Sequence, residues 1–139
     1  MKNIFCAICG GVSSIALFLI GDINVSFIIL LVFMCIDYIS GLVMAGIFKK
    51  SGKSESGGLS SKAGWIGLVK KCLTLIMVII ANMLDTALNV GYIRNAVIIG
   101  FSVNELISIV ENMGIMGVPI PSVITKAIDI LKDKGESEK

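Results

Sequence analysis

Four long apolar runs constrain the fold of this chain more than any motif does. They cover residues 4–20, 25–48, 72–90 and 96–117. A helix of about 20 apolar residues crosses the roughly 30 Å hydrocarbon layer of a bilayer. Charged residues make up only 16% of the 139 residues, whereas a soluble domain has about a quarter. The sequence therefore predicts an all-α integral membrane protein with about four transmembrane helices, assembling as an oligomer.

The polar segments divide the chain into two parts. Residues 1–118 are predicted to form the transmembrane helical domain, with a loop over residues 49–64. Residues 119–139 are predicted to form a cytoplasmic amphipathic helix and tail, whose apolar face would carry Val123, Ala127, Ile130 and Leu131. Because only four residues separate the first two apolar runs, we expect these two helices to form an antiparallel hairpin.

The lysines predict the orientation of the chain in the membrane. The loop and its flanks carry Lys49, Lys50, Lys70 and Lys71, and loops rich in lysine stay in the cytoplasm. With four spans, both termini would then also be cytoplasmic. Lys70, Lys71 and Trp65 are expected at the level of the lipid headgroups. Residues 4–20 follow Lys2 as in a signal peptide, but no small-x-small cleavage pattern follows them, so a retained span is favoured.

Polar residues inside the spans are the candidate functional residues. They are Asp37, Asp85, Asn104, Glu105, Ser108, Glu111 and Asn112. At about 100° per residue, the five between 104 and 112 lie on one face of a helix. A central aspartate costs about 2.5 to 3.5 kcal/mol on insertion into lipid. These side chains are therefore expected to face protein or water.

Two interpretations of the polar face remain open at the level of sequence. Arg94 is the only base between Lys71 and Lys126, so we expect no pairing within the chain to neutralise the acids. The polar residues could form a buried, partly protonated network, or they could line a water-filled lumen built by several copies. Gly41 and Ala45 form a small-xxx-small pair, which favours close packing of helices.

Other kinds of site are not indicated. The chain has no histidine, and its four cysteines (Cys6, Cys9, Cys35 and Cys72) lie in apolar runs, where we expect small buried side chains rather than a metal or redox site. No basic surface with interleaved aromatic residues predicts nucleic-acid binding. No catalytic arrangement of residues and no cofactor motif is present, so we do not expect an enzyme.

An ordered set of short segments resembles one known family. "DYISG" at residues 37–41, "SSKAGWIGLVKK" at 60–71, Asp85, "NELISIVEN" at 104–112 and "GVPIP" at 117–121 follow one another along the chain. Together they resemble the phage holin family that includes the clostridial toxin-secretion holins. The resemblance covers residues 37–121, and the first span is similar in hydropathy alone.

The resemblance implies a function and partners. Holins oligomerise in the bacterial inner membrane and open timed lesions, through which an endolysin or a toxin leaves the cell. An antiholin is a further partner that the family implies. Asp37 and Asp85 would then act in gating or assembly. Two other functions remain as alternatives, which are a small proton-coupled transporter and a membrane scaffold that anchors a partner protein.

Overall fold

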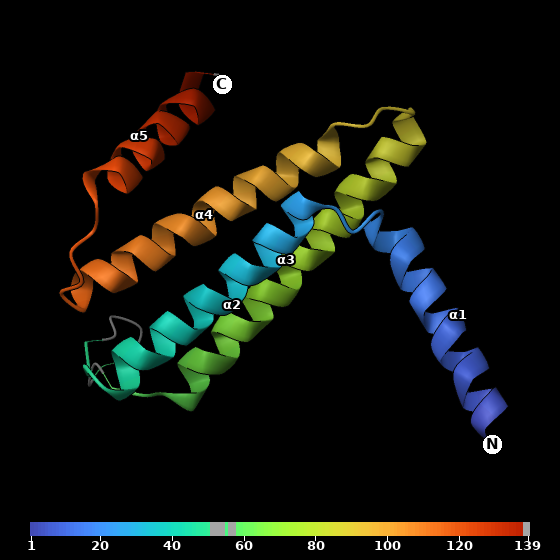
Figure 1. The fold of residues 1–139 in the computed structure, drawn as a ribbon, viewed down its shortest axis with the longest axis horizontal. Coiled ribbons are helices and arrows are strands. Elements are labelled where there is room, and N and C mark those ends of the chain that lie inside the picture. The colour runs from blue at the N-terminus through green and yellow to red at the C-terminus, as the bar shows by residue number, and fades with distance from the viewer. Residues whose placement is uncertain (51–54, 56–57, 138–139) are drawn as a thin grey trace.

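Within residues 1–50, 55 and 58–137, the part of the chain that the structure describes, all regular structure is helical. The computed structural model contains α1 (Lys2–Ile20), α2 (Val25–Gly46), α3 (Ser61–Leu88), α4 (Ile93–Ile115) and α5 (Ser122–Ser137) (Figure 1). Helices α1 to α4 are each long and apolar enough to cross a membrane. The predicted all-α class with four candidate membrane spans is therefore confirmed.

Helices α2, α3 and α4 form a bundle in which each helix runs antiparallel to the next (Figure 1). The parallel helices α2 and α4 make the most extensive contact. At one end of the bundle Lys50 donates a hydrogen bond to the Ile115 carbonyl, and at the other Asn24 donates to Asn95. We call these the loop end, where α2 ends and α3 begins, and the turn end, which carries residues 89–92.

Local capping fixes where the bundle helices begin. The Asn24 side chain accepts a hydrogen bond from the Phe27 amide at the start of α2, and Ser60 does the same for Ala63 at the start of α3. Asparagine and serine are favoured at this position because they satisfy amides that lack a partner within the helix. As a result α3 begins at Ser61, so the helix extends 11 residues before Cys72, where the third apolar run starts.

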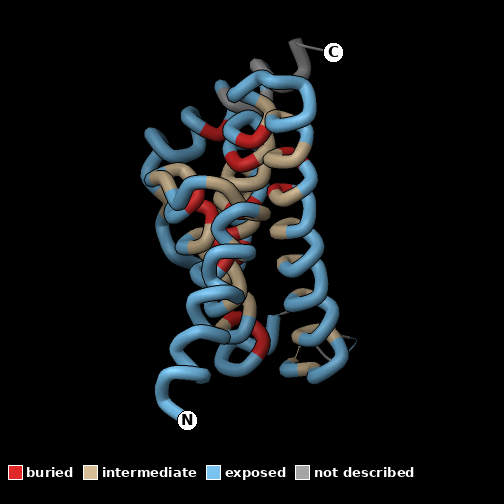
Figure 2. Tube along the Cα trace, turned by 90° about the vertical axis from the view of Figure 1, so that its right-hand side faces the viewer, coloured by how far each residue is buried: buried red, intermediate tan, exposed pale blue. Residues whose placement is uncertain are grey.

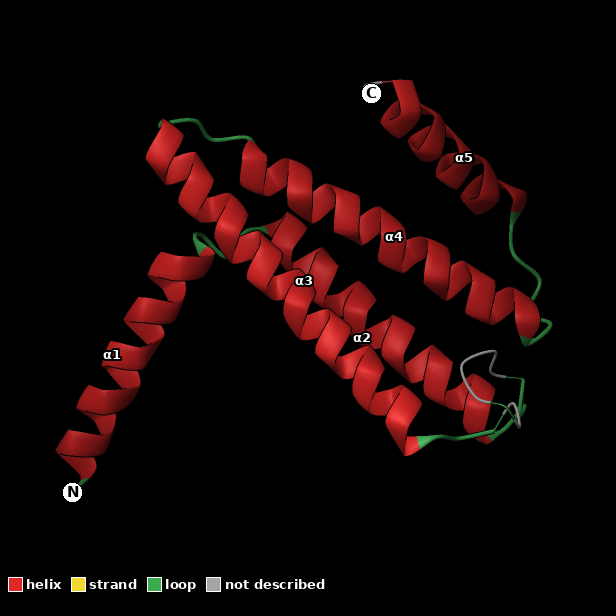
Figure 3. Cartoon of the chain, turned by 180° about the vertical axis from the view of Figure 1, so that it is seen from behind, coloured by secondary structure: helices red, strands yellow, loops and turns green. Residues whose placement is uncertain are grey.

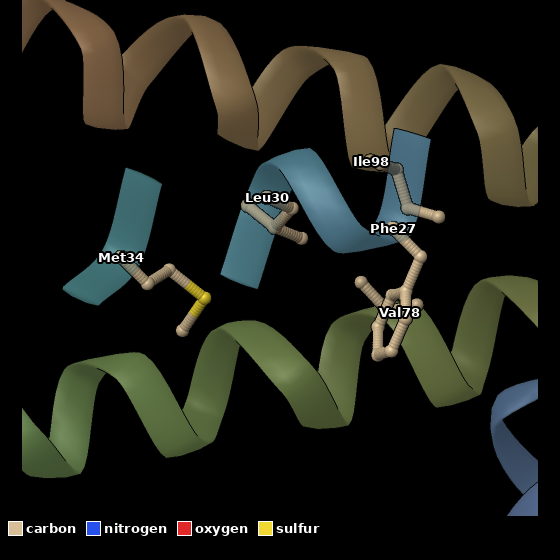
Figure 4. Close-up of a cluster of buried hydrophobic side chains, with 5 residues drawn as sticks. All are labelled: Phe27, Leu30, Met34, Val78 and Ile98. Carbon is tan, nitrogen blue, oxygen red and sulfur yellow. The ribbon is translucent and has the colours of Figure 1, made fainter. Parts of the chain in front are cut away.

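The apolar core of the bundle lies towards its turn end. It consists of Phe27, Leu30 and Met34 from α2, Val78 from α3 and Ile98 from α4, all at most 5% exposed. Figure 4 shows these side chains in the space between the three helices. Spacings of three and four residues along α2 place its members on one face of the helix. We call these five residues the apolar core cluster.

Helix α1 lies apart from the bundle, so the predicted antiparallel hairpin of the first two helices is wrong. It contacts α3 near its own C-terminal end, where Ile20 packs against the apolar core cluster, and the rest of α1 diverges from α2 (Figures 1 and 3). None of its residues is buried, as the pale blue tube at the N-terminus shows (Figure 2). Gly21 redirects the chain with φ at +81°, a value that favours glycine.

Side chains from α3 and α4 hold the C-terminal end of α1. Asn82 donates to the carbonyls of Phe18 and Leu19, and Arg94 donates to those of Ile20 and Asp22. The carbonyls of Phe18, Leu19 and Ile20 lack partners within α1 because they belong to its last turn. The guanidinium of Arg94 also lies 5.5 Å above the ring centre of Phe27. This anchorage sets the direction in which α1 leaves the bundle.

The outer surface of the helices is mostly apolar, and the cysteines lie on it. All four cysteines are exposed thiols, so the prediction that they are buried is wrong. In a membrane protein the solvent around the spans is itself apolar, and a cysteine can face lipid as readily as a protein core.

Helix α5 turns back beside the bundle and packs on α4 (Figures 1 and 3). Its buried side chain is Ile128 at 5% exposed, whereas Val123 and Ile130 are 75% and 57% exposed. The predicted apolar face is therefore not the face that packs on α4. At about 100° per residue, Ile124 and Ile128 lie to one side of that face.

Candidate functional site

Asp37 lies at the centre of a polar network that joins α2, α3 and α4. Its Oδ2 accepts a hydrogen bond of 2.8 Å from Lys71 on α3. Its Oδ1 accepts bonds from Ser108 at 2.6 Å and Asn112 at 3.2 Å, both on α4. A carboxylate with several donors is stabilised in its charged form. The polar network, defined as Asp37, Ser40, Lys71, Glu105, Ser108 and Asn112, therefore connects all three bundle helices.

Lys71 makes a second ion pair within the same network. Its Nζ lies 2.6 Å from Oε2 of Glu105 and 2.8 Å from Oδ2 of Asp37. The side chains of Lys71, Asp37 and Glu105 are only 11 to 13% exposed. One ammonium group is thus shared by two carboxylates at a position shielded from bulk solvent.

The spacing of these residues along the sequence explains why their side chains meet. Glu105, Ser108 and Asn112 are spaced by three and four residues, which places them on one face of α4. Asp37 and Ser40 are spaced in the same way on α2. Asn112 donates to the Ser40 hydroxyl at 3.0 Å, and the Asn112 amide lies beside Gly41, where an added β-carbon would make an ordinary contact of 3.9 Å with it. Ala45 is buried one turn further along α2.

The expectation that no base within the chain pairs with the acids is wrong. That expectation counted bases along the sequence near α4, whereas Lys71 reaches Glu105 across the bundle from 34 residues away. Lys71 was predicted to lie beside Lys70 at the membrane surface. The structure directs its ammonium group into the bundle instead, while Lys70 is exposed.

The polar face of α4 divides into two sets. Glu105 and Asn112 are buried and Ser108 is half-buried against α2, whereas Asn104 and Glu111 are exposed. Neither exposed side chain makes a hydrogen bond or ion pair with another described residue. Only part of the predicted polar face therefore contributes to the polar network.

Asp85 lies elsewhere, at the turn end of the bundle. Its two carboxylate oxygens accept hydrogen bonds from the amides of Ile93 and Arg94 at 3.0 and 2.9 Å. A carboxylate at the N-terminus of a helix satisfies free amides and is favoured by the helix dipole. Asp85 therefore caps α4 from the preceding helix, and it does not meet Asp37.

The remaining predicted residues lie near the loop end. Lys49 and Lys50 follow α2, and Trp65 is 67% exposed in the second turn of α3. Such side chains extend their polar tips to headgroups when a helix ends at a membrane surface. Their placement relative to lipid stays a prediction.

Arg94 is the residue that sequence reasoning underrated. It is 6% exposed and, through the carbonyls of Ile20 and Asp22, joins α1 to α4. A signal was available, because a lone arginine at the edge of an apolar run needs a buried acceptor. Backbone carbonyls at a helix end were the missing acceptors, and they leave no pattern in the sequence.

Known proteins resemble this chain over most of its length. A family model described as "Bacteriophage holin family" matches residues 14–133. A "Probable holin" of Bacillus phage phi105 is 33% identical over 111 residues, which cover 79% of this chain and 76% of the phage protein. An uncharacterised protein of Halalkalibacterium halodurans is 42% identical over 121 residues, covering 83% and 84% of the two chains.

A relative from Clostridium perfringens extends the likeness to nearly the whole chain. This uncharacterised protein is 34% identical over 139 residues, covering 96% of this chain and 99% of the relative. No solved structure matches. The matched residues include α2, α3 and α4 with the whole polar network. The chain belongs to the bacteriophage holin family.

Proposed function

We propose that the chain is a holin that oligomerises in the bacterial cytoplasmic membrane and opens timed lesions for the release of an endolysin or a toxin. Membership of the holin family supports this function. The structural observation that carries the proposal is the polar network, because it keeps charged and polar groups inside the bundle of a single chain. Such groups mark functional positions in membrane helices.

The network suggests how a closed chain could become part of a lesion. While α2, α3 and α4 stay together, Asp37, Lys71 and Glu105 satisfy one another and the outer surface of the bundle stays apolar. Parting α2 from α4 would expose these groups, which are costly in lipid. They would then turn to water or to the same groups of neighbouring copies. Lesion formation would therefore favour many chains opening together.

Glu111 of α4 would provide a first contact between copies, because it already lies on the surface of the closed bundle. Asn104 is exposed as well, but it faces an opening between α2, α3 and α4. Interhelical hydrogen bonds by such side chains contribute about 0.6 to 2 kcal/mol in membranes. Ser108 and Asn112 would join this surface after opening. Asp85 is better suited to hold the α3–α4 turn, because its carboxylate already caps α4.

We propose that the loop end faces the cytoplasm. Lys49, Lys50 and Lys70 lie at this end, and the positive-inside rule favours it. With α1 and α4 both crossing the membrane, the N-terminus and α5 would then be cytoplasmic as well. An antiholin, if one is encoded nearby, would act on this side or within the membrane.

The test is inducible expression in a bacterium, with and without a cytoplasmic endolysin, while turbidity and membrane potential are recorded. We expect abrupt loss of potential at a reproducible time in both cultures and lysis only where the endolysin is present. That pattern requires a lesion that passes a folded protein. A steady culture with intact potential, at verified membrane expression, would reject the proposal.

A further inference from the structure

A cavity of about 420 Å³ lies between α2, α3 and α4 in the half of the bundle nearer the loop end. Gly58, Leu59 and Ser60, which precede α3, line its outer part. Asp37, Lys71 and Glu105 also line it. The ion pairs of the polar network are therefore in contact with open space that extends towards the loop end.

Small residues create this space. Gly41, Ala45, Ala63, Gly64 and Gly67 line the cavity from α2 and α3. Their side chains are short, Tyr38 of α2 lies beside Gly64 and Gly67, and α2 and α3 touch less than either does with α4. The cavity thus follows from the glycines and alanines that the two helices carry at these positions.

Part of the lining is polar and offers partners to water. Besides the ion pairs, Thr74, Asn104 and Ser108 contribute polar atoms. A volume of about 420 Å³ can hold on the order of ten water molecules, each of which needs two to four polar partners. Oε1 of Glu105 accepts no hydrogen bond from the described residues, and water would supply one. Contact with water would also lower the desolvation cost of the two ion pairs.

The other side of the network is closed to water. Along α2 the apolar core cluster occupies positions 27 to 34, the network begins at Asp37, and the cavity extends to Ala45. Leu30, Val78 and Ile98 are fully buried at 0% exposed. Water from the turn end would therefore have to cross a dry, closely packed segment of the bundle.

We propose that the cavity is a water-filled vestibule, open only on the side of the membrane that carries the loop between α2 and α3. Water and small hydrophilic solutes from that side reach the Lys71 ion pairs, whereas those from the opposite side do not. The ion pairs then exchange protons with one compartment alone. This property concerns the closed chain, and it holds whether or not the chain forms lesions.

The test measures which side of the membrane reaches the cavity. In a background with all four cysteines replaced by alanine, single cysteines are introduced at Thr74, which lines the vestibule, and at Leu73, its neighbour, which does not. Thiols in hydrocarbon react slowly because the reactive thiolate does not form there. Sealed vesicles of both orientations are treated with a charged, membrane-impermeant methanethiosulfonate.

Two further variants identify the sides and the integrity of the vesicles. Ser61→Cys reports the loop end, and Tyr92→Cys reports the turn end, since both positions are exposed. In vesicles of the orientation that labels Ser61→Cys, Tyr92→Cys should stay unlabelled. This result shows that no lesion has made the membrane leaky. Asn104→Cys probes the same vestibule from α4, in case Thr74→Cys alters folding.

We expect Thr74→Cys and Asn104→Cys to be labelled only from the side that labels Ser61→Cys. Thr74→Cys should react about tenfold or more faster than Leu73→Cys, and Val78→Cys should not react from either side. Absence of labelling at both vestibule positions would overturn the proposal, because the cavity would then be dry or occluded. Labelling from the Tyr92 side, or equal rates at Thr74→Cys and Leu73→Cys, would overturn it as well.

Discussion

At the scale of single residues, Lys71 links the two carboxylates of the polar network across the bundle. Its ammonium group neutralises one of two carboxylates that α2 and α4 bring to the same place. Removing one partner of a buried ion pair leaves an uncompensated charge and costs about 3 to 5 kcal/mol. Lys70, its neighbour in the sequence, is exposed and supports no comparable contact.

Replacing Lys71 should therefore destabilise the protein far more than replacing Lys70. We expect Lys71→Gln to lower the free energy of unfolding by about 3 kcal/mol or more, because two carboxylates lose their shared cation. Lys70→Gln should change it by less than about 0.5 kcal/mol, as surface substitutions do. Thermal unfolding of the purified protein in detergent measures both. Equal effects of the two substitutions would contradict a structural role for the Lys71 ion pairs.

The residues of the network could be found from the sequence, but their partners could not. Asp37, Glu105, Ser108 and Asn112 are conspicuous because each interrupts an apolar run. Lys71 lies at the edge of such a run, where a lysine is ordinarily explained by the membrane surface. Whether Lys71 faces the polar network or the membrane surface depends on where α3 begins and how α3 is rotated. Both depend on contacts between helices that are far apart in the sequence.

At the scale of elements, the four spans were predictable and the direction of α1 was not. Runs of about 20 apolar residues determine that helices form in lipid, since every backbone group must then be satisfied within the helix. The path of α1 depends on two residues at the start of the connection, Gly21 and Asp22, and on the side chains of Asn82 and Arg94. Short connections alone do not distinguish a hairpin from two diverging helices.

Gly21 is the position at which this direction can be tested. A β-carbon there would lie 2.5 Å from Oδ1 of Asn82, and φ is +81°. We expect Gly21→Ala to displace Asn82 and weaken the attachment of α1, at a cost of about 1 to 3 kcal/mol for the backbone conformation alone, which only glycine readily adopts. Hydrogen exchange of the Arg94 and Phe18 regions measures the loosening.

Gly91→Ala is the matched control for Gly21→Ala. Gly91 also lies in a connection at the turn end, but no atom approaches its β-carbon position within 4 Å. This substitution should leave exchange at the end of α1 unchanged. Suppose that exchange at the end of α1 becomes faster in Gly91→Ala, or does not become faster in Gly21→Ala. Either result would show that the attachment of α1 does not depend on Gly21.

At the scale of the whole molecule, the bundle is ordered along its axis. The apolar core cluster lies towards the turn end, the polar network follows it, and the cavity extends towards the loop end. The polar network carries two acids for one base, so the network itself holds an excess of negative charge. The balance of this charge should affect how long a holin of this structure stays closed.

Substitutions that change this charge in opposite senses should shift the time of lysis in opposite directions. Glu105→Gln leaves Lys71 with one carboxylate, which makes the group neutral, and we expect later lysis at equal expression. Lys71→Gln increases the negative charge and should give earlier lysis or loss of the protein. Turbidity after induction with an endolysin measures both. Asp129→Asn, an exposed acid of α5, is the control and should leave the time unchanged.

The position of Lys71 in the chain also bears on how the protein is made. It stands 34 residues after Asp37 and 34 residues before Glu105, so α2 enters the membrane with a carboxylate whose cation has not yet reached the membrane. α2 tolerates this because its mean hydropathy is 2.4, against 1.5 for α4. α4, the least apolar span, leaves the ribosome only after both Asp37 and Lys71. The order of synthesis thus delivers the helix that most needs polar partners when those partners are already in the membrane.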